Sequence, residues 1–348
     1  MEINKLLKID NKSRVPNYQQ IVNSITHNVS IGNLKANQKI LSINRLSLEL
    51  SLPRETIEKA YNILKDRNII NFISSNGFYV SKNNINKNLK ILFLINKLSW
   101  YKMEIYNSFL TNIGTHTNTE LYIYHCNETL FLNHLKKQKK NYDYYIVMPH
   151  FKTKESEHCN TTNAITYALN KIPKDKLVII DNIKASIQNN IITVYEDYEK
   201  DIYNALSLGI NKIKKHKKII LVYPNKGVSP YPKSIKKGFI KFCSEHKLDY
   251  DIFDKIYDDM VLLKGDLFIT IDEDDLINLM EQISENELVL GKEIGVISYN
   301  DTPLKALLGI TVITTDFKKM GAKTAQMILN NEKGKYKVPF YFIDRDSI

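Results

Sequence analysis

Two side chains at the start of a predicted helix have the chemistry to contact nucleic acid. Pro53 precedes the stretch RETIEKAYNIL and so places Arg54 and Thr56 in the first turn of that helix. An arginine at a helix start in the major groove can donate two hydrogen bonds to guanine O6 and N7, a contact that discriminates between bases by about 1–3 kcal/mol. A threonine hydroxyl and free backbone N–H groups suit phosphate. We therefore predict that this helix reads DNA.

Residues 1–82 contain the elements that would hold this helix in place. Apolar residues recur at helical spacing in 17–29, a second helix fits 44–50 with Asn44 as its cap, and Ser51 is the candidate cap of the third helix. The strands IINFIS and GFYVS follow, joined by the turn Ser75-Asn76-Gly77, and Asn-Gly favours a hairpin because both residues accept positive φ. Three helices and a hairpin predict a winged helix-turn-helix.

The positive charge of the chain is concentrated in this amino-terminal part. Residues 1–90 hold 14 Lys and Arg against 6 Asp and Glu, whereas residues 91–348 hold 35 against 32. A basic excess confined to one region is expected of a unit that faces a polyanion such as DNA. The alternatives are a solvated basic surface and a winged helix that binds protein.

Length and composition restrict the class of protein. With 348 residues, of which 43% are hydrophobic, the chain can form two or three globular units with buried cores. Its three cysteines, Cys126, Cys159 and Cys243, lie far apart and lack metal-ligand spacing, which favours a reducing compartment. We find neither a signal peptide nor an apolar run long enough to span a membrane, and we expect a cytoplasmic protein.

From residue 90 onward, short apolar strands alternate with helices. Strands apolar on both faces indicate parallel sheets covered by helices, and about ten strands exceed one sheet, so we predict two similar lobes. The polar residues 83–89 separate residues 1–82 from this body, 90–348, as a linker. Predicted helices cover 103–113, 198–214, 232–246 and 318–330, and predicted strands cover 89–95, 120–126, 142–148, 176–181, 190–195, 217–223, 249–253, 266–271, 293–299 and 310–315.

The amino-terminal part resembles the GntR family of bacterial transcription regulators. The resemblance rests on YQQI, IGNLKANQKIL, RLSLELSL, RETIEKAYNIL and GFYV. It implies that Arg45, Arg54, Thr56 and the Gly77 turn occupy the DNA-contacting positions of that family. The usual Gly-x-Gly of the family's hairpin is reduced here to Asn-Gly.

The body resembles the periplasmic-binding-protein-like (type I) effector domain of the LacI/GalR regulators. YDYYIVMPH, VISYNDTPLKALLGITVITTDFKKMGAKTAQMIL and the terminal FIDRDSI carry this resemblance. Together the two parts resemble the arabinose-repressor architecture. The resemblance implies a homodimer that binds a double-stranded DNA operator, has no cofactor, and responds to a small-molecule effector such as a sugar.

In that fold the ligand lies between the lobes, beside the carboxyl ends of the strands. The resemblance favours Asp272 and Asp301 for contacts to ligand hydroxyls, and Trp100 or Tyr101 can cover the apolar face of a sugar ring. A strand-end aspartate that caps a helix is the ordinary alternative. Lys233 is the candidate to replace an arginine that relatives with sugar or purine ligands have in this region. Other polar or rigid residues that follow predicted strands are Asn96, Pro149, His150 and Asn300.

The sequence departs from both families at a few positions. Leu41-Ser42-Ile43 replaces the usual Leu-Pro-Ser before the first arginine, and Pro53 replaces a serine before the second, so the hydroxyl of that serine is missing. Relatives with sugar or purine ligands have an arginine three residues before the Gly of the Gly-Phe helix. Ile235 stands there, with Lys233 and Lys236 nearby, so the ligand class is left open.

Other chemistry finds less support in the sequence. The run Asp272 to Asp275 could bind magnesium, but acids at a predicted helix start are explained by the helix dipole. His116, His125 and His134 lack the i, i+4 spacing of zinc ligands on a helix. No GxSxG, Walker A or GxGxxG motif occurs. We predict no metal and no catalysis. An enzyme that uses the interlobe cleft and an adaptor without DNA binding are the alternatives.

Overall fold

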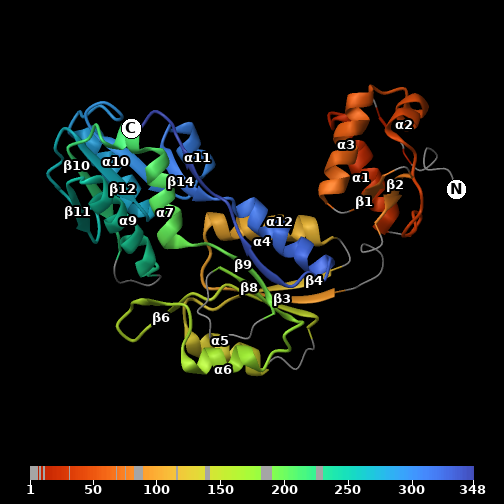
Figure 1. The fold of residues 1–348 in the computed structure, drawn as a ribbon, viewed down its shortest axis with the longest axis horizontal. Coiled ribbons are helices and arrows are strands. Elements are labelled where there is room, and N and C mark those ends of the chain that lie inside the picture. Colours follow the sequence, from red (N-terminus) through yellow and green to blue (C-terminus); the bar gives the residue numbers. More distant parts are fainter. Residues whose placement is uncertain are drawn as a thin grey trace. The chain divides into compact units, whose positions relative to one another are not determined.

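The chain divides into two compact units. The first contains residues 1–90 and the second contains most of the remaining chain (Figure 1). Most of the predicted linker falls outside the described residues, so the predicted domain boundaries stay predictions. The computed structural model describes residues 7, 9–10, 12–30, 32–67, 69–74, 76–81, 89–114, 117–137, 142–181, 190–224 and 230–348.

The amino-terminal unit, called the head below, consists of three helices followed by an antiparallel hairpin, in the predicted order. Apolar side chains of all three helices form one buried core, in which the Tyr61 ring meets the Phe78 ring edge-on at 4.8 Å between centroids. Gly77 begins the second strand with φ +96°, a backbone conformation that favours glycine. The elements are α1 (Asn17–Ser30), α2 (Ile43–Leu50), α3 (Arg54–Asp66), β1 (Ile70–Ile73) and β2 (Gly77–Val80).

Two of the predicted helix caps in the head are wrong. The hydroxyl oxygen of Ser42, not of Asn44, accepts the N–H of Arg45 at 3.3 Å and caps α2, because α2 begins one residue earlier than predicted. Ser51 ends α2 in a left-handed conformation with φ +52° instead of capping α3. Pro53 precedes α3 and makes no side-chain capping bond.

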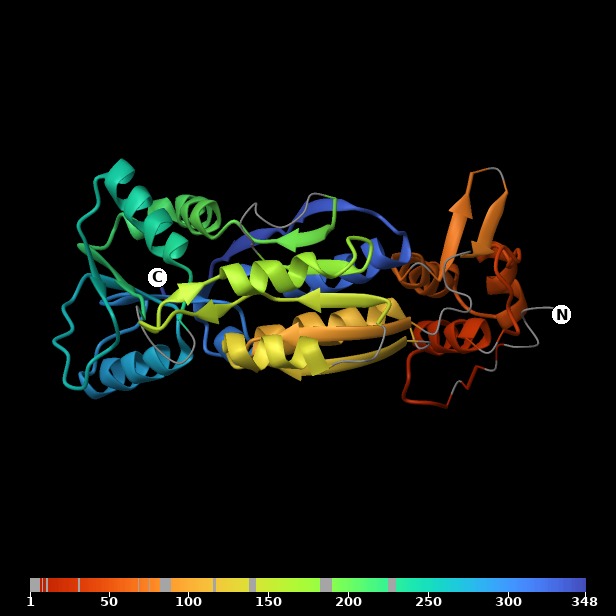
Figure 2. The same ribbon diagram turned by 90° about the horizontal axis from the view of Figure 1, so that it is seen from below.

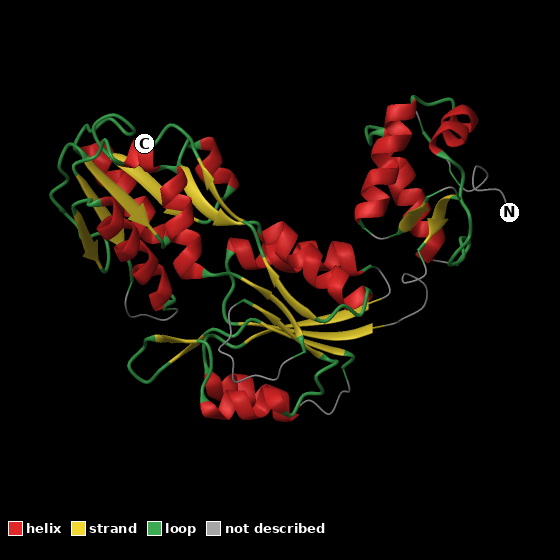
Figure 3. Ribbon diagram, viewed as in Figure 1, coloured by secondary structure: helices red, strands yellow, loops and turns green. Residues whose placement is uncertain are grey.

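The body contains two six-stranded sheets, which define an amino lobe and a carboxyl lobe (Figures 1 and 3). The amino-lobe sheet has the order β15-β9-β8-β5-β3-β4, and a small hairpin, β6–β7, follows β5. Its strands are β3 (Leu89–Ile95), β4 (Thr117–Ile123), β5 (Tyr144–Val147), β8 (Leu177–Ile180), β9 (Ile192–Tyr195) and β15 (Gly334–Lys337); the hairpin is β6 (Phe151–Lys152) and β7 (His158–Cys159).

Helices cover both faces of the amino-lobe sheet. In Figures 1 and 2, α4 and α12 lie on one face, and α5 and α6 lie on the other. Phe131 of α5 and Ile165 and Leu169 of α6 join the core below the sheet. The helices are α4 (Trp100–Ile113), α5 (Glu128–Lys137), α6 (Asn163–Asn170) and α12 (Phe317–Leu329).

The carboxyl-lobe sheet has the order β11-β10-β12-β13-β14-β16, in which β16 alone among its described strands runs antiparallel to its neighbour. Its strands are β10 (Lys218–Val222), β11 (Tyr250–Phe253), β12 (Asp266–Thr270), β13 (Gly295–Tyr299), β14 (Thr311–Thr315) and β16 (Phe340–Ile343). Its helices are α7 (Tyr198–Leu208), α8 (Ile210–Ile213), α9 (Lys233–His246), α10 (Glu273–Glu285) and α11 (Pro303–Leu307).

Successive strand residues of the carboxyl lobe enter two separate cores. Ile219 and Leu221 of β10 pack with residues of α7 and α9, whereas Ile220 and Val222 pack with residues of α10. This alternation follows from the two-residue period of a strand, whose side chains point to opposite faces. It explains why these strands read as continuous apolar runs in the sequence.

The chain passes between the lobes three times. It leaves the amino lobe after β9, returns after β14, and crosses again between β15 and β16. On its return it enters α12, which packs closely on α4. A side chain at Gly321 of α12 would stand 2.2 Å from the carbonyl oxygen of Ile105, so only glycine allows this approach. The Ser108 hydroxyl donates to the carbonyl oxygen of Lys318 at 2.6 Å.

Candidate functional site

Four polar residues at the carboxyl ends of neighbouring amino-lobe strands form what we call the strand-end cluster. Asn96 follows β3, His150 lies beyond β5, Asp181 follows β8 and Glu196 follows β9. These strands run parallel to one another, so their carboxyl ends meet at one edge of the sheet. All four residues are at least nine-tenths buried. Buried polar groups at this edge are the usual constituents of a binding site in an α/β fold.

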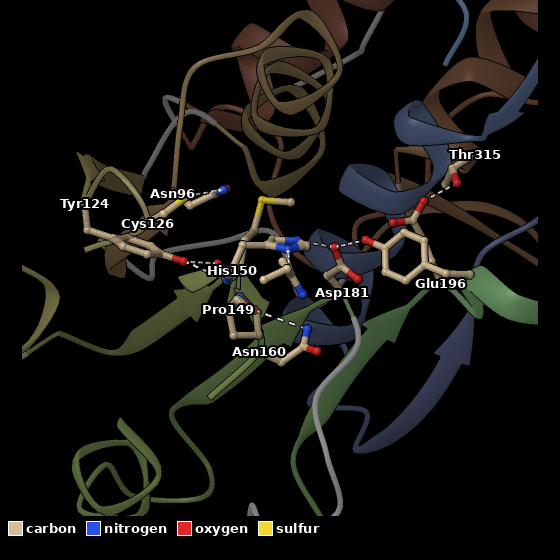
Figure 4. Close-up of polar contacts among 12 residues, drawn as sticks. Asn96, Tyr124, Cys126, Pro149, His150, Asn160, Asp181, Glu196 and Thr315 are labelled. Carbon is tan, nitrogen blue, oxygen red and sulfur yellow. Dashed lines mark hydrogen bonds and ion pairs between the residues drawn. The ribbon is translucent and has the colours of Figure 1, made fainter. Parts of the chain in front are cut away.

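Asp181 is the centre of the hydrogen bonding in this cluster (Figure 4). Its Oδ2 atom lies 2.5 Å from His150 Nε2 and accepts the hydroxyl proton of Tyr198, also at 2.5 Å. The other ring nitrogen of His150, Nδ1, lies 2.9 Å from Nε2 of His158 in the β6–β7 hairpin. The backbone N–H of His150 donates to the hydroxyl of Tyr124 at 3.0 Å. The carboxylate is therefore held in place from several elements.

Glu196 lies where the chain first leaves the amino lobe. Its Oε1 atom accepts the hydroxyl proton of Thr315, the last residue of β14, where the chain returns. Burial raises the pKa of Glu196 to about 8, and the charge of Asp181 adds to this effect. At neutral pH the side chain is therefore mainly protonated, and it can both donate and accept hydrogen bonds.

Lys102 of α4 is buried to 1% exposure near these carboxyl groups. Burial lowers the pKa of Lys102 to about 7, with a contribution from Lys97, while Asp181 and Glu196 oppose the shift. The ammonium nitrogen of Lys102 lies 5.5 Å from the centroid of the Tyr101 ring. No sequence pattern indicated this burial, since a lysine near a helix start is usually solvated.

The two histidines are held in their neutral forms. Burial lowers the pKa of His150 despite the opposing charge of Asp181, and burial with the neighbouring His150 lowers the pKa of His158 to about 3. Neutral imidazoles offer one donor and one acceptor each. With Asn96, whose Oδ1 atom is buried and accepts no hydrogen bond from described residues, the cluster presents groups suited to a polyhydroxylated ligand.

Three of the predicted effector residues lie near contacts that join the two lobes around this cluster. Burial raises the pKa of Tyr101, and the charges of Glu196 and Asp181 add to it. Lys233 pairs with Glu157 of the β6–β7 segment at 2.7 Å. Asp272 caps α10 and accepts the hydroxyl of Tyr231 at 2.7 Å, while Lys97 lies 5.2 Å from that ring. Their ligand contacts stay predictions.

The other two predicted effector residues lie elsewhere. Trp100 and Asp301 line a separate surface cavity, and Asp301 Oδ2 accepts a hydrogen bond from Arg345 Nη2 at 2.8 Å. Sequence reasoning did not single out Lys102, Asp181, Glu196 or Tyr198. Asp181 and Glu196 directly follow apolar strands. Considering the polar residue after every predicted strand would therefore have singled them out.

The predicted DNA-contacting residues of the head are available on its surface. Arg54 is the first residue of α3 and is exposed, and Thr56 is half-buried in the same turn. The Arg45 side chain is 70% exposed and lies 3.3 Å from Glu49 across one helical turn. Gly77 stands at the tip of the hairpin. These positions are compatible with the predicted roles.

The described part of the chain has neither a metal-ligand group nor a membrane-spanning helix. No group of three or more histidine, cysteine, aspartate or glutamate side chains there is arranged to hold a metal ion. No described helix is long and apolar enough to cross a lipid bilayer. His116, one of the histidines considered above, lies outside the described residues.

Comparison with known proteins supports the fold of the body. Residues 212–347 match the periplasmic binding protein-like domain. The fold is similar to a LacI family transcriptional regulator from Lactobacillus casei with bound glucose (TM-score 0.59, 12% identity, 74% of this chain and 99% of that chain). It is also similar to the Escherichia coli transcriptional repressor AscG (TM-score 0.56, 13% identity, 75% and 99%).

A third solved structure is a periplasmic binding protein/LacI transcriptional regulator from Alkaliphilus metalliredigens complexed with D-xylulofuranose (TM-score 0.54, 15% identity, 74% of this chain and 98% of that chain). No curated protein matches the sequence. These likenesses establish that the body has the two-lobed, periplasmic-binding-protein-like α/β fold.

Proposed function

We propose that the protein is a cytoplasmic transcriptional regulator of the arabinose-repressor architecture, with a GntR-type winged helix-turn-helix at its amino terminus. Its affinity for a DNA operator is controlled by a small-molecule effector, a sugar or sugar derivative. The observation that carries the proposal is the strand-end cluster, a set of buried polar groups at the edge of a two-lobed fold whose chain crosses between lobes three times. Ligand binding there changes the angle between the lobes.

The head supports the DNA-binding half of the proposal. Its three helices and hairpin present Arg54 and Arg45 to solvent, and the basic excess of the chain lies in residues 1–90. A sugar as effector is supported by the neighbours of similar fold, which contain glucose and D-xylulofuranose.

A homodimer is supported by apolar side chains on the surface of the carboxyl lobe. Leu304, Leu307 and Leu308 on or beside α11 are exposed, Leu307 to 85%. Apolar residues gathered in this way commonly mark an interface. A two-fold dimer would place two heads on two half-sites of an inverted repeat, so a change in lobe angle would alter head spacing and operator affinity.

The effector half of the proposal is tested with Asp181→Asn. We expect a screen of monosaccharides by thermal melting to find a sugar that stabilises the wild-type protein. The variant should bind that sugar at least about tenfold more weakly, because a hydrogen bond to a charged group contributes about 1.5–3 kcal/mol. Asp344→Asn, which changes an exposed carboxylate paired with Lys212, is the matched control. Equal sugar affinity in both variants would contradict the assignment.

The DNA-binding half is tested with Arg54→Ala. Fluorescence anisotropy with promoter and scrambled duplexes should show that the variant loses sequence preference, by about 1–3 kcal/mol, while sugar-induced stabilisation stays the same. Lys65→Ala, at the other end of α3, is the control and should change both duplexes alike. If the wild-type protein bound neither duplex at low salt, the proposal would be wrong.

A further inference from the structure

A surface cavity of about 330 Å³, which we call the hinge pocket, contains none of the four strand-end residues in its lining, although its Thr315 donates to Glu196. Its volume is in the range of small-ligand sites. Its walls come from α4 of the amino lobe, from the segments that follow β13 and β14, and from β16. Three aromatic and three acidic residues are among those that line it: Trp100, Phe317, Tyr341, Glu104, Asp301 and Asp316.

The aromatic residues leave ring surface open to a ligand. Trp100 is 55% exposed and Tyr341 is 43% exposed, whereas Phe317 is buried and closes the inner side. Indole and phenol rings attract a cation placed over their faces, tryptophan most strongly. The apolar parts of the pocket therefore suit an organic cation with an apolar body.

The acidic residues define the charge that the pocket accepts. Asp301 uses Oδ2 for Arg345, but its Oδ1 atom is buried and accepts no hydrogen bond from described residues. Asp316 accepts the backbone N–H of Lys319 at 2.8 Å. Glu104 lies 3.6 Å from the ammonium group of Lys318, whose side chain is 78% exposed. An ammonium ion from the chain itself thus already lies at the edge of the pocket.

We propose that the hinge pocket is a second ligand site, for a primary ammonium ion that carries an apolar or aromatic body. The ammonium group pairs with the carboxylates of Glu104 and Asp316 and displaces Lys318 from Glu104, and the body of the ligand stacks on Trp100. A quaternary ammonium ion fits less well because it cannot donate a hydrogen bond. The ligand contacts residues of both lobes, so its binding favours one lobe angle and provides a second regulatory input.

The chain contains its own reporter for this site, because Trp100 is its single tryptophan. The full-length protein is titrated at pH 7.5 with 2-phenylethylamine and, in parallel, with 2-phenylethanol, which has a similar shape without the charge. We expect a saturable change in tryptophan fluorescence with the amine and none with the alcohol at equal concentration. Equal responses to both compounds, or a response that does not saturate, would overturn the proposal.

Two variants locate the binding. Glu104→Gln and Asp316→Asn each remove one carboxylate, and asparagine retains the ability to accept the N–H at the start of α12. Each should weaken amine binding about fivefold. Lys318→Met should strengthen binding because it removes the competing ammonium, and Asp344→Asn should leave it unchanged. Unaltered affinity in both carboxylate variants would overturn the proposal, and Asp181→Asn should retain amine binding, which separates this site from the proposed effector site.

Discussion

Each lobe of the body buries a lysine, and the two lysines have opposite surroundings. In the carboxyl lobe, Lys305 donates to the carbonyl oxygens of Tyr299 at 2.8 Å and Asn300 at 3.1 Å, with Glu273 at 3.4 Å. In the amino lobe, Lys102 makes no recorded hydrogen bond to a described residue. Their exposures are equally low, at 3% and 1%. Burial therefore does not distinguish them, but hydrogen bonding does.

The difference in hydrogen bonding indicates a structural role for Lys305 and favours a ligand-binding role for Lys102. A buried amine loses its hydration, and carbonyl oxygens and a carboxylate replace that hydration for Lys305. Burial lowers the pKa of both lysines, but Lys102 makes no such hydrogen bond to a described residue, and its pKa falls to about 7. Groups whose pKa is perturbed beside other titratable groups gather at functional sites. We infer that Lys305 holds the segment after β13 in place, whereas the amine of Lys102 is available to bind the ligand.

Lys305→Met should lower stability more than any other substitution of a buried lysine in the described part of the chain. The substitution leaves the carbonyl oxygens of Tyr299 and Asn300 buried without their donor, at a cost of about 1–3 kcal/mol. We expect urea denaturation to show a lower free energy of unfolding by about that amount. An unchanged denaturation midpoint would show that Lys305 has no structural role and would contradict the contrast drawn with Lys102.

Glu196→Gln should change how stability depends on pH. The pKa of Glu196 is raised from 4.5 to about 8 in the folded chain, so between these values the folded state retains a proton that the unfolded state has lost. Its contribution to stability is therefore present below about pH 4.5 and falls as pH rises to 8, by at most about 1.4 kcal/mol per pH unit. Subtracting the variant's denaturation data from the wild type's should reveal this slope. A flat difference would show that Glu196 is ionised throughout.

Lys102→Met should have the smallest effect on stability, and of opposite sign to Lys305→Met. Methionine has a similar length and needs no hydration, and replacing a poorly paired buried charge by an apolar side chain is often stabilising. We expect the free energy of unfolding at pH 7 to rise by about 1 kcal/mol, while sugar-induced stabilisation decreases. Destabilisation as large as that of Lys305→Met would mean that the two lysines have the same role.

The sequence predicted the parts of the fold that depend on local pattern. The runs LKILFLI and KLVII were recognisable because both strands are buried on both faces. β15 and β16 were missed, because β15 alternates between half-buried and exposed residues and is a strand only through its pairing with β9. The predicted helix over 198–214 is split into α7 and α8 at Gly209, where the Phe342 ring leaves no space for a side chain.

The candidate site was less accessible to sequence reasoning. Strand-end residues can be read from the pattern, and Asn96 and His150 were noted in this way as residues that follow predicted strands. The burial of Lys102 depends on residues that are distant in the sequence, and the separation of Trp100 from Tyr101 depends on the direction in which each side chain leaves α4. Neighbouring residues on a helix face different ways, so Trp100 lines the hinge pocket and Tyr101 does not.

The contact at Gly321 has a mechanical consequence for the whole body. Because α12 touches the backbone of α4 there, the two helices cannot slide or tilt past each other without collision. The pair should move as one rigid body, and any rotation of the carboxyl lobe must be absorbed in the three segments that cross between the lobes. A methyl group added at that glycine would push α12 away from α4 at their point of contact.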